Sequence, residues 1–304
     1  MKRLYIAAVI LAAGCSACQC SSKGPDDNSG LIDETFVPSV GEKDSEGYTL
    51  VWADEFDGES LRTADWNVEV NGNGGGNNEL QYYAARNVTV ENGCLVLTAR
   101  KESYNGKEFT SGRLNTNKKR YFTHGKIESS IKLPKTANGL WPAFWMLGND
   151  FNEVGWPRCG EIDILEMGNA TGIRNNNQET YFNGACHWGF YRDGAYPNYA
   201  KSSNAPYSLQ DGEFHLYTLI WDERSIAMYL DRDKNPSVQP YFEMLISDTS
   251  SDWSTGNYFH HDFFIVYDLA VGGNFPGIHN AAGITALAEG PASMYIDFVR
   301  VSQK

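Results

Sequence analysis

Apolar and polar residues alternate with a period of two along most of the chain after Tyr48. Successive side chains of a strand point to opposite faces, so this pattern indicates strands that bury one face. The clearest strand segments are residues 127–133, 214–221, 226–230, 263–269 and 294–301. Asn-Gly or Asp-Gly pairs, which are typical turn residues, stand at 57–58, 92–93, 105–106 and 193–194. The pattern contains neither a long amphipathic helix nor an internal repeat. It predicts an all-β fold, a two-sheet β-sandwich of jelly-roll type.

The N-terminus has the pattern of an export signal. Two basic residues, Lys2 and Arg3, precede an apolar run over residues 4–14, which is too short to span a bilayer. The run ends in Leu-Ala-Ala-Gly-Cys, which resembles a bacterial lipobox, where the cysteine becomes the lipidated first residue. We predict a lipoprotein signal peptide over residues 1–14 and lipidation of Cys15. An ordinary signal peptide cleaved nearby, or modification of Cys18, remains an alternative.

The segment after Cys15 is polar and poor in apolar residues, so it cannot bury a core. We therefore predict a flexible linker over residues 15–45 and one folded domain over residues 46–304. The acidic pair at 26–27 resembles signals that send some lipoproteins to the outer cell surface. We expect a lipid-anchored protein of the cell envelope, at the outer membrane, on either its surface or its periplasmic face.

Charge and composition restrict the partners. The formal net charge of −13 repels nucleic acid and anionic membrane surfaces, but it does not penalise a neutral ligand. With 8 Trp and 17 Tyr, the domain has aromatic surface left for such a ligand. We expect a monomer that contacts the membrane through its lipid and binds no nucleic acid. The later cysteines, at 94, 159 and 186, have no zinc-site spacing, and a Cys159–Cys186 bridge stays open.

Three acids alternate with large aliphatic residues at Glu161-Ile162-Asp163-Ile164-Leu165-Glu166. On a strand, Glu161 and Asp163 share a face, whereas Glu166 lies at an odd offset from both. One β-bulge between Asp163 and Glu166 returns Glu166 to the acidic face and leaves Ile162 and Ile164 in the core. The alternative is a solvent-facing acidic strand, but no basic residue relieves the repulsion and the partner face is aliphatic.

The bulge brings the two glutamates to a useful separation. Glu161 and Glu166 are then about four strand steps apart, roughly 13 Å. Their side chains can lean inward until the carboxyls are about 5–5.5 Å apart, the separation of a retaining glycosidase. Asp163 lies between them, within hydrogen-bond reach of Glu161. Because three crowded carboxyls cannot all ionise cheaply, at least one pKa should rise.

Aromatic and imidazole side chains near this motif suit a sugar. Trp141 and Trp145 are four residues apart, hence on one strand face, where they either stack on sugar rings or fill the core. His187 follows the acidic strand, and we expect it beside Glu166, where it would help to set the proton. A buried structural histidine is the alternative.

On these residues the chain resembles glycoside hydrolase family 16, in the laminarinase-like branch, from about Tyr48 to Val301. The acids match the signature Glu-x-Asp-x-x-Glu in its bulged form, and residues 155–160 resemble the lead-in to that strand. The resemblance implies a concanavalin-like jelly roll with a substrate cleft on the concave sheet. It implies an endo-acting retaining hydrolase of β-1,3-glucan or mixed-linkage β-1,3/1,4-glucan, which works by double displacement. Glu161 would be the nucleophile and Glu166 the acid/base, while Asp163 would hold Glu161 in place.

The resemblance also implies further binding residues. Asn78, in Asn-Asn-Glu-Leu-Gln-Tyr at 77–82, and Arg113, in Ser-Gly-Arg at 111–113, would contact sugar hydroxyls. Read alone, the first segment is a flexible loop and Arg113 a salt-bridge partner. A structural calcium would be held by Glu55, the carbonyl of Gly93 and Asp297, since Ca²⁺ prefers oxygen ligands. We expect no cofactor for catalysis.

Two other functions stay open. One is a galactan hydrolase of the same family, of agarase or carrageenase type, but a sulfated substrate would favour a basic site and the motifs carry few Lys or Arg. The other is a glycan-binding lipoprotein without catalysis, which would keep the aromatic residues and lose the acids.

Overall fold

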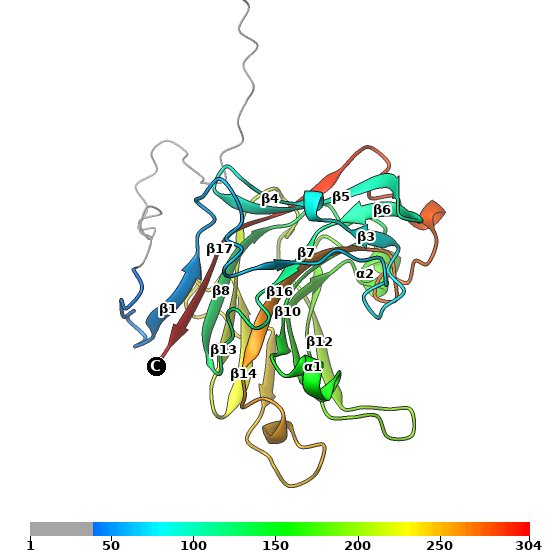
Figure 1. Cartoon of the computed structure of the whole chain (residues 1–304). Helices are drawn as coiled ribbons and strands as arrows, with labels where there is room; N and C mark the ends of the chain where they lie inside the picture. Colours follow the sequence, from blue (N-terminus) through cyan, green and yellow to red (C-terminus); the bar gives the residue numbers. More distant parts are fainter. Residues whose placement is uncertain (1–38) are drawn as a thin grey trace, which may run out of the picture.

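The computed structural model describes residues 39–304, so the predicted signal peptide, Cys15 and most of the predicted linker lie outside the described residues. Two sheets pack face to face (Figure 1). The larger sheet has ten strands, in the order β15 (Phe242–Leu245), β14 (Ser225–Leu230), β13 (His215–Trp221), β8 (Gly125–Lys132), β17 (Ala292–Gln303), β5 (Cys94–Tyr104), β6 (Lys107–Ser111) and β3 (Gln81–Tyr83), with β1 (Thr49–Asp54) on β17 and β4 (Val88–Glu91) on β5.

The smaller sheet has seven strands, in the order β12 (Asn198–Asn204), β11 (Tyr181–His187), β10 (Glu161–Met167), β9 (Leu140–Gly148), β16 (Phe263–Val271), β7 (Arg113–Asn115) and β2 (Asn67–Val68). All its pairings are antiparallel. Helices in the described part are short: α1 (Phe151–Val154), α2 (Ala170–Asn175) and the 3₁₀ turns η1 (Ala85–Asn87), η2 (Thr255–Asn257) and η3 (Ala281–Gly283). The predicted all-β sandwich is confirmed.

Alternation in the sequence becomes burial between the sheets. Ile127 and Ile131 of β8 join the same buried cluster as Ile162 and Ile164 of β10, so the core lies between the two layers. The five predicted strands are all present, as β8, β13, β14, β16 and β17. The seven-stranded sheet therefore turns its other face, with the residues that alternate with Ile162, away from the core.

The predicted turn at Asn92-Gly93 joins two strands in a hairpin. Asn92 and Gly93 both have positive φ, 53° and 77°, between β4 and β5. Such a pair of left-handed residues suits a two-residue hairpin loop, which is why Asn-Gly stands there. Residues before β1 also belong to the fold: the Gly41 N–H donates to the Leu50 carbonyl at 2.8 Å, inside the segment that the sequence assigned to the linker.

Two further observations concern the envelope and the thiols. Between residues 39 and 304, the structure has no helix long and apolar enough to cross a membrane. Cys159 and Cys186 are buried free thiols, so the bridge that the sequence left open does not form between them.

Candidate active site

The bulge in β10 places the three acids. Asp163 pairs with Ala185 of β11 and Glu166 with Asn183, so two residues of β10 stand against the single Gly184. Ile164 and Leu165, the two residues of the bulge, are both fully buried in the core. Glu161, Asp163 and Glu166 consequently share the outer face of the seven-stranded sheet, which we call the acidic face. The predicted bulge is confirmed.

The pairing of the strands extends the acidic face across six strands of the smaller sheet. Residues directly opposite one another on neighbouring strands have side chains close enough to interact. One row of such residues runs from β7 to β12 and contains Arg113, Asp268, Ala143, Glu166, Asn183 and Ser202. Glu166 thus has the small Ala143 on one side, with the carboxyl of Asp268 one strand beyond, and Asn183 on the other side.

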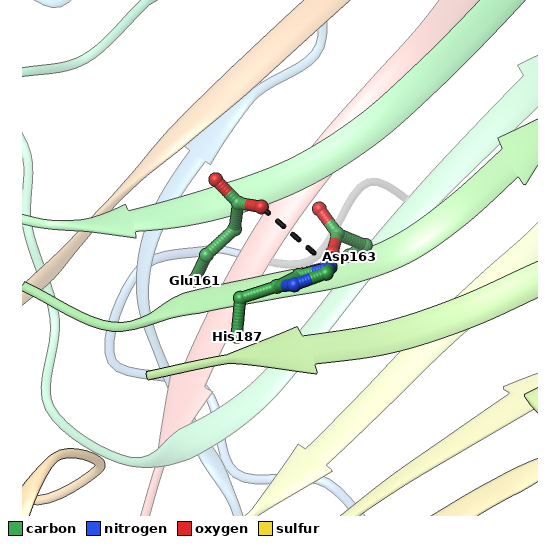
Figure 2. Close-up of side chains that lie close together, drawn as sticks. All are labelled: Glu161, Asp163 and His187. Atoms are coloured by element: carbon green, nitrogen blue, oxygen red, sulfur yellow. Dashed lines mark ion pairs between the residues drawn. The ribbon is translucent and has the colours of Figure 1, made fainter. Parts of the chain in front are cut away.

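Glu161 is held by two neighbours. The indole N–H of Trp156, in the loop between β9 and β10, donates to its Oε2 at 3.2 Å. His187 lies opposite on β11, with Nε2 at 3.9 Å from Glu161 Oε1 and 3.4 Å from Asp163 Oδ2. Figure 2 shows Glu161 and Asp163 of β10 and His187 of the adjacent strand β11 pointing toward one another. The same three groups offer donor atoms within 4.8 Å of one another, an N/O set that can bind a divalent cation.

The position of His187 corrects one prediction. We expected it beside Glu166, but Glu166 pairs with Asn183, and His187 pairs with Glu161. Antiparallel pairing explains the difference, because it brings the last residue of β11 beside the first residue of β10.

The expected hydrogen bond between Asp163 and Glu161 is also absent. Asp163 is buried, and its Oδ2 has no hydrogen-bond partner among the described residues. Two carboxylates both accept, so they can bond only when one carries a proton.

Both predicted tryptophans lie on the acidic face and bind carboxyls. Trp141 donates its indole N–H to Glu166 Oε1 at 3.1 Å and stacks on Phe275, with ring centroids 4.8 Å apart. Trp145 donates to Asp268 Oδ1 at 2.7 Å. Neither ring belongs to the main core cluster between the sheets, but Trp141 is buried and Trp145 packs against a smaller apolar cluster that includes Leu147. Packing therefore accounts for part of both rings, and their contact with a sugar stays a prediction.

Burial and mutual repulsion change the acidity of this face. Burial first, and the charges of neighbouring carboxyls second, raise the pKa of Asp163 well above its usual range. Burial raises the pKa of Glu161 to about 7 and that of Glu166 to about 8. Hydrogen bonds from Trp156 and Trp141 respectively oppose these rises. The predicted rise is therefore confirmed, and it affects all three acids.

Arg113 lies at one end of the row. Its Nε is 3.0 Å from Glu69 Oε1, and its guanidinium lies 5.0 Å from the ring centroid of Trp145. The salt bridge expected for an arginine in an acidic protein is present, and the residue nevertheless borders the acidic face. Asn78 has a positive φ of 57° and donates to Asn274 Oδ1 at 3.1 Å, so its loop docks on the segment that follows β16.

A family model described as "Glycosyl hydrolases family 16" matches residues 75–243, more than half of the chain. The chain belongs to glycosyl hydrolase family 16. Among curated relatives, it is 37% identical to the clotting factor G alpha subunit of Tachypleus tridentatus and 33% identical to a beta-glucanase of Rhodothermus marinus. Each match covers 84% of this chain, with 34% of the first relative and 85% of the second. The chain thus spans about a third of the first relative.

Similar solved structures agree with the fold. The chain is 39% identical to the GH16 of the Bacteroides ovatus mixed linkage glucan PUL, solved in complex with a G4G4G3G product, with a TM-score of 0.72. The match covers 83% of this chain and 100% of that one. The laminarinase catalytic domain of Thermotoga maritima is 36% identical, with a TM-score of 0.69 and coverage of 84% and 98%. The predicted family and jelly-roll class are confirmed.

Two residues of this family 16 site escaped the sequence analysis. The sequence analysis predicts only a strand around Asp268, although a single acid inside the apolar run 263–271 is a visible signal. Burial raises its pKa to about 7, and its charge bears on Glu161. The sequence places Trp156 only within the lead-in segment 155–160. Its contact with Glu161 depends on a loop whose path the alternation of residues does not encode.

The residues expected to bind calcium lie on the other sheet. Both oxygens of Glu55 accept from Arg300, at 2.9 and 2.8 Å. Burial, with the charge of Glu55 as the second cause, raises the pKa of Asp297 to about 6. Gly93 occupies the turn between β4 and β5. Two partly buried carboxylates that repel each other form a site that a cation can stabilise. The guanidinium of Arg300 already provides part of the positive charge there.

Proposed function

We propose that this family 16 protein is an endo-acting, retaining β-glucan hydrolase. Its substrate would be β-1,3-glucan, mixed-linkage β-1,3/1,4-glucan or both. One observation carries the proposal: the bulge in β10 puts Glu161 and Glu166 on one face with Asp163 between them. The relatives named above as beta-glucanase and laminarinase support the substrate class.

The reaction would proceed in two steps. In the first, the Glu161 carboxylate attacks the anomeric carbon while the Glu166 carboxyl gives its proton to the leaving oxygen, so that a glycosyl-enzyme forms on Glu161. In the second, Glu166 accepts a proton from water, which attacks the same carbon and releases Glu161. The surroundings suit this division: the charge of Arg113 favours an ionised Glu161, whereas burial and the charge of Glu161 together raise the pKa of Glu166 and so favour its protonated form.

Asp163, the aromatic rings and the polar residues would serve this reaction. Asp163 would help to keep Glu161 in place through the ring of His187, whose Nε2 lies beside both carboxyls. Trp141, Trp145 and His187 surround the acids, and Arg113 and Asn78 offer donors to hydroxyl groups. A neutral polysaccharide fits this set, because the chain's net charge of −13 disfavours polyanions.

A panel of polysaccharides tests the substrate. We expect reducing-sugar release from laminarin, from mixed-linkage glucan or from both, and almost none from carboxymethyl cellulose, agarose or carrageenan. Chain sizing should show oligosaccharides of several lengths early in the digestion, as an endo-acting enzyme produces. Activity on a galactan alone would favour the galactan hydrolase, and binding to glucan without cleavage would favour the glycan-binding lipoprotein.

The location is a separate proposal, supported by the sequence of residues 1–15. The protein would be attached by lipid at Cys15 to the outer membrane and would act there as a monomer. Cys15→Ser should release it into the soluble fraction or block its processing. Unchanged membrane association would mean that Cys18 is the lipidated residue or that the protein has no lipid anchor. Sedimentation of the soluble variant would report its oligomeric state.

Calcium binding at Glu55, Gly93 and Asp297 is likewise proposed. An ion that binds only the folded state raises the melting temperature. We expect Tm to rise with CaCl₂ and fall with chelator, and Asp297→Asn to remove the response. Equal Tm with and without calcium would refute the site, and catalysis itself should need no added cofactor.

A further inference from the structure

The connection between β11 and β12 carries a tyrosine that reaches the acidic face. The hairpin turns at Asp193 and Gly194, both with positive φ, and it closes where the Trp188 N–H donates to the Pro197 carbonyl at 3.1 Å. Tyr196, in its returning arm, packs edge-on against Trp156, with ring centroids 4.8 Å apart. Its hydroxyl lies 3.1 Å from Nδ1 of His187.

The other nitrogen of His187 faces a carboxyl that needs a donor. Nε2 is 3.4 Å from Asp163 Oδ2, the buried oxygen that has no hydrogen-bond partner within residues 39–304. A neutral imidazole carries one N–H and one lone pair, and a bond at one nitrogen decides which nitrogen holds the hydrogen. If the hydroxyl of Tyr196 donates to Nδ1, the hydrogen is on Nε2 and points toward Asp163. The opposite tautomer would turn a lone pair toward Asp163 and Glu161.

We propose that Tyr196 is a positioning residue of the active site: its hydroxyl donates to Nδ1 of His187 and fixes the neutral ring with its hydrogen on Nε2. His187 then turns an N–H toward the unpaired oxygen of Asp163, 3.4 Å away, without adding a positive charge beside Glu161. A neutral donor leaves the nucleophile its full negative charge, whereas an imidazolium would pair with it. This proposal rests on the proposed role of Glu161.

The surroundings of His187 agree with a neutral ring. Glu161 and Asp163 face it from β10, the ring of Trp156 lies 6.2 Å away, and Tyr196 faces it from the hairpin. The two acids favour the imidazolium and burial opposes it, and burial lowers the pKa of His187 to about 4. Burial also raises the pKa of Tyr196 to about 12, so its hydroxyl keeps the hydrogen that it donates.

Tyr196→Phe removes the hydroxyl and keeps the ring that packs on Trp156. Loss of one hydrogen bond should lower kcat roughly two- to tenfold, with KM changed less than about twofold, because the bond orients a group and does not touch the sugar. Tyr191→Phe is the matched control. Its ring lies 5.1 Å from that of Tyr196 on the same hairpin, and within the described residues its hydroxyl makes no hydrogen bond.

Nitrogen-15 NMR of the histidine rings reads the tautomer directly. The chain has 6 histidines, so the signal of His187 is assigned by its loss in His187→Asn. At pH 7 the full-length enzyme should show a protonated Nε2 and a bare Nδ1 at His187. Tyr196→Phe should give a mixture of tautomers or a raised pKa at His187, while Tyr191→Phe should match the parent in signal and in kcat.

A parent enzyme with its hydrogen on Nδ1 would overturn the proposal, because Asp163 would then have to carry the donated proton. So would a Tyr196→Phe variant that matches Tyr191→Phe in tautomer and kcat. The parent spectrum decides the question even if the variant is unstable. It is also independent of turnover, so an enzyme inactive on every glucan would refute the proposed function and leave the tautomer to be judged by itself.

Discussion

Trp141→Phe isolates the hydrogen bond that moderates the proposed acid/base. The indole N–H of Trp141 lies 3.1 Å from Glu166 Oε1, and the ring stacks on Phe275 at 4.8 Å. Phenylalanine keeps a ring for that stack and removes the donor. The donor stabilises the carboxylate and so lowers the pKa of Glu166, against the burial that raises it to about 8. Without it, the pKa should rise further.

The size of the shift follows from the energy of the bond. A hydrogen bond to a charged group contributes about 1.5–3 kcal/mol, and one pKa unit corresponds to about 1.36 kcal/mol. We therefore expect a rise of roughly one unit or more. Glu166 must be protonated to act, so activity is present below its pKa and is lost as the pH rises through it. The alkaline limb of kcat/KM should consequently move to higher pH.

The assay is the pH dependence of kcat/KM on a soluble β-glucan, measured for the parent and the variant. Trp145→Phe serves as the control, since Trp145 donates to Asp268 and not to Glu166. Its alkaline limb should not move to higher pH, because the loss of its donor leaves Asp268 less charged and so does not raise the pKa of Glu166. An alkaline limb that stays in place, or moves to lower pH, in Trp141→Phe would refute the assignment of that limb to Glu166.

Five other substitutions, in three groups, test separate parts of the site and the core. Glu161→Gln and Glu166→Gln should each lose more than the roughly 10²–10⁴-fold that acid–base assistance contributes, with an unchanged circular dichroism spectrum, and Asp163→Asn should lose less; near-parental turnover in either glutamine variant would remove the mechanism. Asp268→Asn removes a charge that raises the pKa of Glu161, so the acid limb of kcat/KM, where Glu161 must ionise, should move to lower pH, and a move to higher pH would contradict this reasoning. Ile164→Ala, in the fully buried bulge, should lower the free energy of unfolding in urea by about 2–5 kcal/mol, and a loss under about 1 kcal/mol would mean that the site collapses around the smaller side chain.

Most of the strands and turns of the fold can be predicted from local patterns in the sequence. Alternation at 127–133, or a short apolar run such as 263–269, predicts a strand from the residues of the segment alone. The bulge in β10 can also be predicted from local sequence. Glu161, Asp163 and Glu166 can share one face of a strand only if the strand has one extra residue between Asp163 and Glu166. Asn92-Gly93 marked its hairpin through backbone conformation alone.

The pairing between strands cannot be predicted from these local patterns. His187 was placed beside the wrong glutamate because its partner depends on the register of β11 against β10, which alternation does not fix. Asp268 is not predicted because it lies on β16, two strands from β10 and about a hundred residues later in the chain. Trp156 is close to Glu161 in sequence, but its contact depends on the path of a loop. The contact of Tyr196 with His187 likewise requires the path of a hairpin.

The configuration of the first product tests the central claim, a double displacement by Glu161 and Glu166, most directly. Proton NMR of a concentrated enzyme digest of laminarin or mixed-linkage glucan follows the anomeric signals within the first minutes, before mutarotation mixes them. Two displacements at the same carbon return it to its original configuration, so the account predicts that the β-anomer of the new reducing end appears first and the α-anomer grows in later. An α-anomer that appears first would mean a single displacement, and it would contradict both the roles of the two glutamates and the close carboxyl spacing from which they were inferred.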